Sequence, residues 1–158
     1  MRGNFERMLD LVGEFFDVKN DPGQIDVDEK VLKKLSKIHE ATISQKENKD
    51  GPIAWILVIP TTKKIMQDFL ENKISENELL NKTKPSQKFE AVYLCSASVL
   101  PEFRNQGLAK QLTVQAIRKI KKNYPVEYLY YWKFSKGGER LAESISSAMK
   151  IPLRVKIK

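Results

Sequence analysis

The segment from residue 99 to residue 112 combines residue types and spacings that suit anion binding. It reads Val-Leu-Pro-Glu-Phe-Arg-Asn-Gln-Gly-Leu-Ala-Lys-Gln-Leu, which predicts a strand end, a tight loop and a helix start. The first N–H groups of a helix have no intrahelical partner and lie at the positive end of its dipole. Gly107 and Ala109 admit a close approach, while Arg104 and Lys110 add positive charge. The segment therefore predicts a site for a phosphate-bearing ligand, with Arg104 also able to brace the loop through backbone carbonyls.

Two other reactive side chains occur once each, Cys95 and His39. A single cysteine excludes an intrachain disulfide and a cysteine-based metal cluster, and a single histidine argues against the usual zinc and Ser-His-Asp sites. Cys95 lies in an apolar strand pattern, where a cysteine packs as a small hydrophobic residue. His39 ends a predicted helix, where the dipole favours it. Neither residue is expected to be catalytic, and no metal site is expected.

These residues lie in a succession of predicted helices and strands. Apolar residues spaced three and four apart predict helices over residues 4–16, 26–40, 65–71, 76–81, 107–122 and 139–149. Apolar and β-branched runs predict strands over 41–45, 52–61, 89–100, 126–134 and 152–158, with turns at 20–23 and 46–51 and a break at Lys136-Gly-Gly. Strands that alternate with helices in the second half predict parallel pairing through right-handed crossovers. We predict an α/β layered domain whose N-terminal region adds helices and a hairpin.

Length and composition bound the class of protein. The 158 residues correspond to about one domain of roughly 100–200 residues, and 41% hydrophobic with 30% charged residues is typical of a globular chain. The longest apolar run, Ile53 to Pro60, is the size of a strand and far short of the ~20 residues that cross a bilayer. The first residues lead into an amphipathic pattern unlike that of a secretory signal. A cytoplasmic protein with no membrane partner is expected.

Charge is distributed unevenly along the chain. The formal net charge is +8, yet residues 1–29 contain eight acidic and three basic residues, whereas residues 110–158 contain twelve basic and three acidic ones. The basic half suggests a nucleic acid or a phosphate-bearing cofactor, although a lysine-rich solvated surface explains the same count. Only six of the 28 basic residues are Arg. Because proteins that read nucleic-acid sequence rely on Arg forks, a nucleic-acid partner is not expected.

The stretch Arg104-Asn105-Gln106-Gly107-Leu108-Ala109 resembles the Arg/Gln-x-x-Gly-x-Gly/Ala signature of the GNAT superfamily of acyl-coenzyme A N-acyltransferases. Its flanks are similar too, with a buried strand before it and an aliphatic helix after it. The resemblance implies a GNAT-like fold: a central, mostly antiparallel mixed sheet with a parallel, splayed strand pair and flanking helices. It implies one domain over residues 1–158, with a helical N-terminal part (1–40) and a cofactor-binding half (89–158).

The resemblance also implies where acetyl-coenzyme A (acetyl-CoA) would bind. The backbone of Ala97, Ser98 and Val99 would pair with the pantetheine arm, and Ser135, after the next strand, would touch the arm. The diphosphate would fall on the loop and helix start, namely Arg104, Asn105, Gln106, Gly107, Leu108, Ala109 and Lys110. The basic residues from position 110 onward would then attract the anionic cofactor.

The catalytic residues of the family are matched only in part. Some members carry a Glu on the central strand eleven residues before the motif, where this chain has Tyr93, and the nearest carboxylate is Glu90. We expect Glu90 to accept the amine proton through water and Tyr93 to orient water or the acceptor, because a phenol with a pKa of about 10 is a poor base. The family's Tyr acid is replaced by Leu141-Ala142, which leaves Tyr131 or water to protonate the departing thiolate.

The sequence thus predicts an N-acetyltransferase that transfers an acetyl or short acyl group from coenzyme A to a primary amine by direct attack in a ternary complex. The acceptor stays open among a small amine, an antibiotic, a polyamine and a protein N-terminus, and a homodimer stays open as well. The alternative is a non-catalytic module that binds coenzyme A esters, or a Lys-rich module that binds nucleic acid. Steep salt dependence without thioester preference would indicate the nucleic-acid binder.

Overall fold

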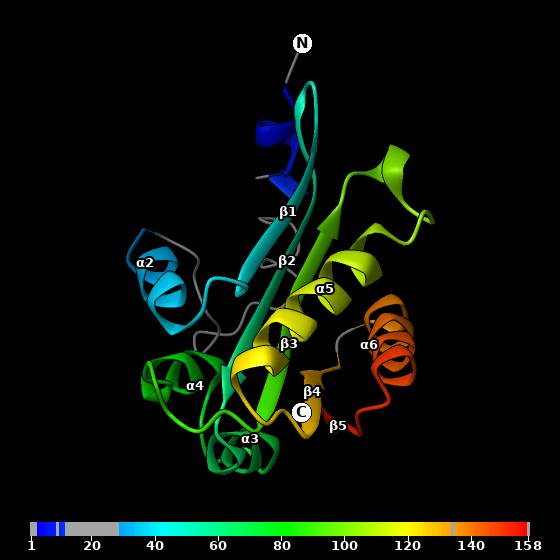
Figure 1. Cartoon of the computed structure of the whole chain (residues 1–158). Helices are drawn as coiled ribbons and strands as arrows, with labels where there is room; N and C mark the ends of the chain where they lie inside the picture. The colour runs from blue at the N-terminus through cyan, green and yellow to red at the C-terminus, as the bar shows by residue number, and fades with distance from the viewer. Residues whose placement is uncertain (1–2, 9, 12–28, 134, 158) are drawn as a thin grey trace.

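A five-stranded mixed sheet runs through the centre of the molecule and has helices on both faces (Figure 1). The computed structural model describes residues 3–8, 10–11, 29–133 and 135–157. The strands lie side by side in their order along the chain: β1 (Ile43–Asn48), β2 (Gly51–Thr61), β3 (Ala91–Val99), β4 (Tyr128–Trp132) and β5 (Leu153–Lys156). The helices are α2 (Glu29–Ile38), α3 (Lys63–Leu70), α4 (Glu76–Lys82), α5 (Leu108–Asn123) and α6 (Lys136–Met149), with a 3₁₀ turn η1 (Pro101–Phe103). Residues 4–8 and 10–11 are also helical.

The sheet is antiparallel in its first half and parallel in its second. β1 pairs with β2, and β2 with β3, in antiparallel register, whereas β3 with β4 and β4 with β5 are parallel pairs. A tight turn is enough to join β1 to β2, but parallel neighbours need a crossover connection. Here α5 makes the crossover from β3 to β4, and α6 makes the one from β4 to β5. The predicted mixed α/β sheet is confirmed.

Alternating side chains on the strands build one core on each face of the sheet. On β2, Leu57 and Ile59 pack in the core that also contains residues of α2, α3 and α4. Ile56 and Val58 pack in the opposite core, with residues of α5 and α6. Successive strand residues point to opposite faces. A strand that is covered on both faces is apolar nearly throughout, which explains the continuous apolar run of β2.

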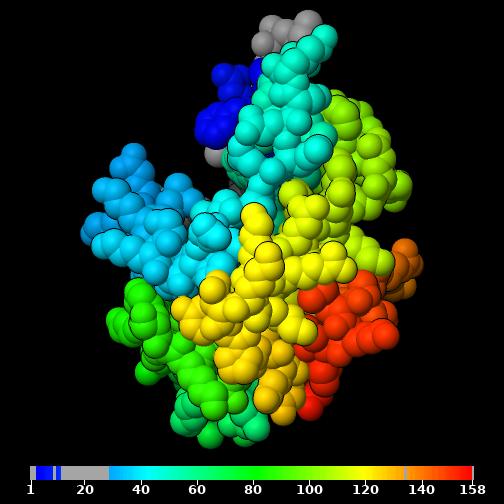
Figure 2. Space-filling view, viewed as in Figure 1, coloured from blue at the N-terminus to red at the C-terminus, as the bar shows by residue number. Residues whose placement is uncertain are grey.

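The described N-terminal residues lie against the tip of the β1–β2 hairpin, blue against cyan in Figure 2. The Asn4 side-chain amide donates to Asn48 Oδ1 at 3.0 Å and to the Gly51 carbonyl at 3.4 Å. The Phe5 and Trp55 rings form an edge-to-face pair with centroids 6.0 Å apart. Within the described ranges, no helix is long and apolar enough to cross a membrane.

Most element boundaries differ by a few residues from the sequence prediction, and two of these differences have a clear physical cause. The turn predicted over residues 46–51 is shorter, because β1 continues to Asn48 and the Asn48 side chain accepts the Asp50 N–H at 2.9 Å. The predicted break at Lys136-Gly-Gly is wrong, because α6 begins at Lys136. Ser135 caps this helix by accepting the Gly138 N–H at 3.0 Å, which offsets the low helix propensity of the two glycines. The features predicted over residues 12–28 lie outside the described residues.

Candidate active site

The strands β3 and β4 diverge after a short stretch of pairing. Their register joins Ala91 to Tyr128, Val92 to Leu129 and Tyr93 to Tyr130, whereas β3 continues to Val99. A β-bulge lies just beyond the last pair: Leu94 is paired with Val58 and Ser96 with Leu57, so Cys95 is the extra residue on β3. The parallel, splayed strand pair that the resemblance implied is therefore present.

A cavity of about 480 Å³ occupies the opening between these strands. This volume lies within the usual range for small-molecule sites. One wall is the β3 segment 94–99, and the opposite wall includes Tyr131 and Trp132 of β4. The helices α5 and α6 complete it with Ala109, Thr113, Gly137, Gly138, Leu141, Ala142 and Ile145.

The loop before α5 closes one end of the cavity. Arg104 Nε donates to the Val99 carbonyl at 3.1 Å, so the predicted bracing of the loop by Arg104 is confirmed. Asn105 (φ 65°) and Gly107 (φ 76°) both adopt left-handed backbone conformations, and Gly107 is the N-cap residue of α5. Glycine enters this region without steric cost. After this turn α5 begins at Leu108, and Ala109 in its first turn forms part of the cavity wall.

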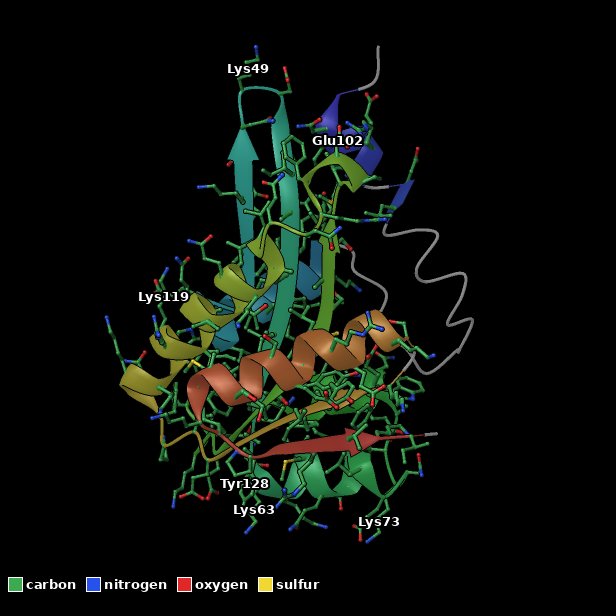
Figure 3. The ribbon with its side chains drawn as sticks, turned by 90° about the vertical axis from the view of Figure 1, so that its right-hand side faces the viewer. Lys49, Lys63, Lys73, Glu102, Lys119 and Tyr128 are labelled. Carbon is green, nitrogen blue, oxygen red and sulfur yellow. The ribbon has the colours of Figure 1, made fainter. Side chains whose placement is uncertain are left out.

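The N-terminus of α6 reaches the cavity as well. Ser135, Gly137 and Gly138 all belong to its wall. Figure 3 views the molecule from the side of α6, which lies across the middle of the picture in orange. The absence of side chains at Gly137 and Gly138 leaves the backbone of this first turn accessible to a ligand.

The residues predicted to bind the cofactor fall into two groups. Those in the cavity wall are Ala97, Ser98, Val99, Arg104, Ala109 and Ser135. The others lie outside the wall, on the loop and first helical turn at its edge: Asn105, Gln106, Gly107, Leu108 and Lys110. Six of the eleven predicted residues therefore line the cavity, and the other five flank them along the chain.

The predicted catalytic residues are placed differently from each other. Tyr93 is fully buried, and its hydroxyl donates to Glu76 Oε2 at 2.5 Å. Burial, and next the Glu76 charge, raise the pKa of Tyr93 well above its usual value, so the phenol stays protonated. Glu90 precedes the first residue of β3, where its backbone accepts from Glu127 and Tyr128 at 2.7 and 3.1 Å. The cavity wall on β3 begins four positions later, at Leu94.

Glu76, which the sequence did not single out, is a buried carboxyl group beside this site. It is 1% exposed, accepts the Tyr93 hydroxyl and lies 3.8 Å from the Cys95 sulfur. In the sequence it belongs to a helix-start pattern, Ser75 with Glu78 three residues on, and an acid in that turn has an ordinary explanation. No local signal relates it to β3.

Cys95 and His39, the single cysteine and the single histidine of the chain, have structural contacts. Regular alternation along β3 predicts that Tyr93, Cys95 and Ala97 share one face, but this is wrong: Cys95 packs with the core that contains Tyr93, whereas Ala97 packs with the opposite core. The bulge at Cys95 shifts the alternation by one residue. His39 Nδ1 accepts the Ala41 N–H at 3.0 Å and its Nε2 lies 3.1 Å from Asn123 Oδ1, in the cap region of α2. Among the described residues no group of three or more His, Cys, Asp and Glu side chains could hold a metal ion.

With its mixed sheet and splayed parallel strands, the chain adopts the GNAT fold. It superposes on the crystal structure of Chaetomium thermophilum Naa20 in complex with a bisubstrate analogue, with a TM-score of 0.52 and 14% identity over 93% of this chain and 67% of that one. An aminoglycoside acetyltransferase, meta-AAC0020 from an uncultured soil metagenomic sample in complex with trehalose, matches with a TM-score of 0.44 and 14% identity over 91% of this chain and 80% of that one.

No protein-family model matches the chain, and no curated protein matches it either. At 14% identity the structural match establishes the fold.

Proposed function

We propose that this protein is an N-acetyltransferase that transfers an acetyl group from acetyl-CoA to an amine, with both substrates bound at once. The observation that carries the proposal is continuity: the cavity follows the backbone edge of β3 over residues 94–99 and ends at the loop before α5. A strand edge suits an extended, amide-containing arm, and a helix N-terminus suits a diphosphate. The Naa20 structure holds a bisubstrate analogue, and sharing its fold supports a two-substrate complex.

The residues present fit acetyl-CoA. β4 pairs with β3 only up to Tyr93, so the backbone of Ala97, Ser98 and Val99 is available to pair with the pantetheine arm. A Cβ built on Gly107 would meet no atom within 4 Å, so there is open space beside the loop for the diphosphate. Arg104 and Lys110 would add positive charge there, and Ser135 would contact the arm from the side of α6. In this arrangement residues 89–158 supply most of the cavity wall, as the cofactor-binding half of one domain.

The chemistry needs a proton acceptor for the ammonium, a donor for the tetrahedral oxyanion and an acid for the departing thiolate. A backbone N–H of β3 would meet the oxyanion. Tyr131 lies in the cavity wall, and burial, followed by the charges of Glu139 and Glu143, raises its pKa, which keeps its proton available for the thiolate. Positions 141 and 142 also line the cavity, but they are Leu and Ala, so the acid of some relatives has no counterpart there.

The proposal is tested in two steps. First, thermal unfolding is measured with acetyl-CoA, longer acyl esters and free coenzyme A, since a ligand at about 100 times its Kd adds about 2.7 kcal/mol of stability. Second, thiol release from acetyl-CoA is followed with spermidine, kanamycin and a peptide with a free N-terminus. Stabilisation without thiol release would indicate the alternative, a non-catalytic module that binds coenzyme A esters. Binding of nucleic acid with steep salt dependence and no ester preference would contradict the proposal.

A further inference from the structure

The connection between β2 and β3 carries a buried acidic residue to the cavity. Glu76 is the first residue of α4, and a capping box fixes the start of that helix: Ser75 Oγ accepts the Glu78 N–H, and the Glu78 carboxylate accepts the Ser75 N–H, both at 3.1 Å. This reciprocal pair orients the first turn. The Glu76 side chain is thereby directed at β3 and 1% exposed.

A fully buried carboxyl group is uncommon unless it is paired, because desolvation disfavours its charge. On β3, the Glu76 carboxyl group contacts the Tyr93 hydroxyl at 2.5 Å and the Cys95 thiol at 3.8 Å. The aromatic core around it contains Phe69, whose ring centroid lies 5.0 Å from that of Tyr93. Fold stability alone is served as well by an apolar residue at such a position. A buried carboxyl group that contacts the wall of the cavity is therefore a candidate functional group.

Cys95 lies between Glu76 and the cavity. The Cys95 side chain contacts Glu76 and also forms part of the cavity wall, so one side chain separates the carboxyl group from the cavity. Cys95 is the bulged residue where β3 leaves β4, five positions before Leu100 and the loop that would hold the diphosphate. The thioester end of a bound arm that runs from that loop along β3 would therefore lie near Cys95.

We propose that Glu76 accepts the proton of the acceptor amine, across one water molecule beside the Cys95 thiol, with Tyr93 holding the carboxylate in place. This inference rests on the proposed acetyltransferase function. In the step, the ammonium N–H bond breaks and its proton passes through the water to Glu76, while the freed nitrogen lone pair attacks the thioester carbonyl. As the C–S bond then breaks, the nitrogen loses a second proton to give the neutral amide. The departing thiolate takes a proton from Tyr131 or water, the second nitrogen proton restores that donor, and Glu76 returns its own proton to solvent.

The other titratable groups that the structure describes around Glu76 do not take its place. Tyr93 on β3 and Tyr130 on β4 are fully buried phenols whose pKa values are raised, mainly by burial, so both remain donors. Lys156 on β5 lies over the Phe69 and Trp132 rings, at 5.3 and 5.1 Å, and donates to Asn72. Among the acidic residues in the described part of the chain, Glu76 is the one that contacts both Tyr93 and a residue of the cavity wall.

The test compares Glu76→Gln, which keeps the size and loses the carboxylate, with Glu76→Asp, which keeps a carboxylate and withdraws it. Glu71→Gln is the matched control, an exposed carboxylate on the same connection between β2 and β3 that pairs with Lys73. Glu90→Gln tests the competing base that the sequence suggested. Acetyl-CoA affinity is measured by calorimetry, and kcat and KM by thiol release between pH 6 and pH 10, with the most reactive of spermidine, kanamycin and the peptide.

We expect Glu76→Gln to lower kcat at least tenfold at neutral pH, with partial recovery toward pH 10 and an unchanged Kd for acetyl-CoA, because general bases contribute about 10²–10⁴-fold. Glu76→Asp should retain the wild-type form of the pH profile at a lower rate. Wild-type kinetics of Glu76→Gln across this range, or a pH-dependent loss in Glu90→Gln alone, would overturn the inference. Wild-type protein that releases no thiol with any of the three amines would instead overturn the proposed function, and the inference with it.

Discussion

Arg7 and Glu102 are 95 positions apart in the sequence and form a two-pronged ion pair, in which Nη1 donates to Oε2 at 2.7 Å and Nη2 donates to Oε1 at 2.5 Å. Glu102 belongs to η1, in the connection between β3 and α5. Figure 3 labels Glu102 near the described N-terminal residues in blue. The pair therefore joins the N-terminal helical residues to the connection that bears the proposed diphosphate loop.

This ion pair should be visible in the pH dependence of stability. The hydrogen bond from Arg7 is the main cause that lowers the pKa of Glu102 to about 2, from 4.5. Since the pKa is lower in the folded state, the pair stabilises the fold above about pH 4.5 and loses its effect as the pH falls toward 2. We expect Glu102→Gln to lower Tm at pH 7 and the difference from wild type to narrow over that interval. Thermal melts across the range, with the exposed Glu127→Gln as control, measure it; a constant difference would contradict the prediction.

Gly107→Val should abolish acetyl-CoA binding. Its Cβ branch would project into the open space where the diphosphate is proposed to approach the loop. The φ of 76° also makes any side chain unfavourable there, at a cost of about 1–2 kcal/mol. Gly107→Ala shares the backbone strain without the branch and is the matched control. Calorimetry should show lost binding for Gly107→Val and weakened binding for Gly107→Ala. Wild-type affinity of Gly107→Val would show that the diphosphate does not bind at this loop.

Tyr93→Phe should destabilise the protein more than Tyr130→Phe. Both phenols are fully buried, but Tyr93 donates to the Glu76 carboxyl group, whereas Tyr130 shares a 2.7 Å hydrogen bond with the Thr61 hydroxyl. Removing a partner from a buried polar group costs about 1–3 kcal/mol, and more when that group is charged. Urea unfolding of both variants measures the difference. Equal losses of unfolding free energy in the two variants would show that the hydrogen bond to Glu76 stabilises the protein no more than the hydrogen bond to Thr61 does.

The same Tyr93→Phe variant should also raise the acceptor KM. The hydroxyl holds the carboxyl group that is proposed to receive the amine proton, so its loss should disturb acceptor binding and leave acetyl-CoA affinity intact. Steady-state kinetics with the most reactive amine, alongside calorimetry with acetyl-CoA, separate the two effects. A weaker Kd for acetyl-CoA with an unchanged acceptor KM would assign Tyr93 to the other substrate.

Tyr131→Phe should lower kcat by about tenfold or more at neutral pH if its phenol protonates the thiolate, as general acids contribute about 10²–10⁴-fold. Its place in the cavity wall and its raised pKa, chiefly from burial, both favour this role. Acetyl-CoA affinity should stay the same, because only a hydroxyl is lost. Rates with a thioester analogue that has a more acidic leaving thiol should be less affected. A wild-type kcat of Tyr131→Phe with both esters would indicate that water, and not Tyr131, protonates the thiolate.

The loop and helix start around Arg104 to Ala109 could be predicted from the sequence, because the local sequence pattern and the position of this segment in the fold agree. The run Arg104 to Ala109 predicts a turn into a helix, and the helix propensity and apolar spacing after Gly107 point to the same boundary. The bracing role of Arg104 was also predictable, since a guanidinium near a strand end can satisfy a carbonyl.

Glu76 and Cys95 show what the sequence alone could not predict. Glu76 meets Tyr93 17 positions further along the chain, and only the path of α3 and α4 over the sheet brings them together. The face of Cys95 depends on a bulge, which has no signature in the alternation of β3. The start of α6 was hidden because two glycines suggest a break, while the Ser135 cap sustains the helix.

The order of the strands in space, β1-β2-β3-β4-β5, repeats their order along the chain. Each of the five described strands can therefore be added to the edge of a sheet that already exists, and none of them is inserted between two earlier ones. Pairing between strands that follow one another keeps the closing loops shorter than pairing between more distant strands would, which favours rapid folding. The cavity is different, because its wall needs Ser135, Gly137, Gly138 and Leu141 as well as β3. A chain that is still being synthesised would acquire most of its sheet before it acquired a binding site.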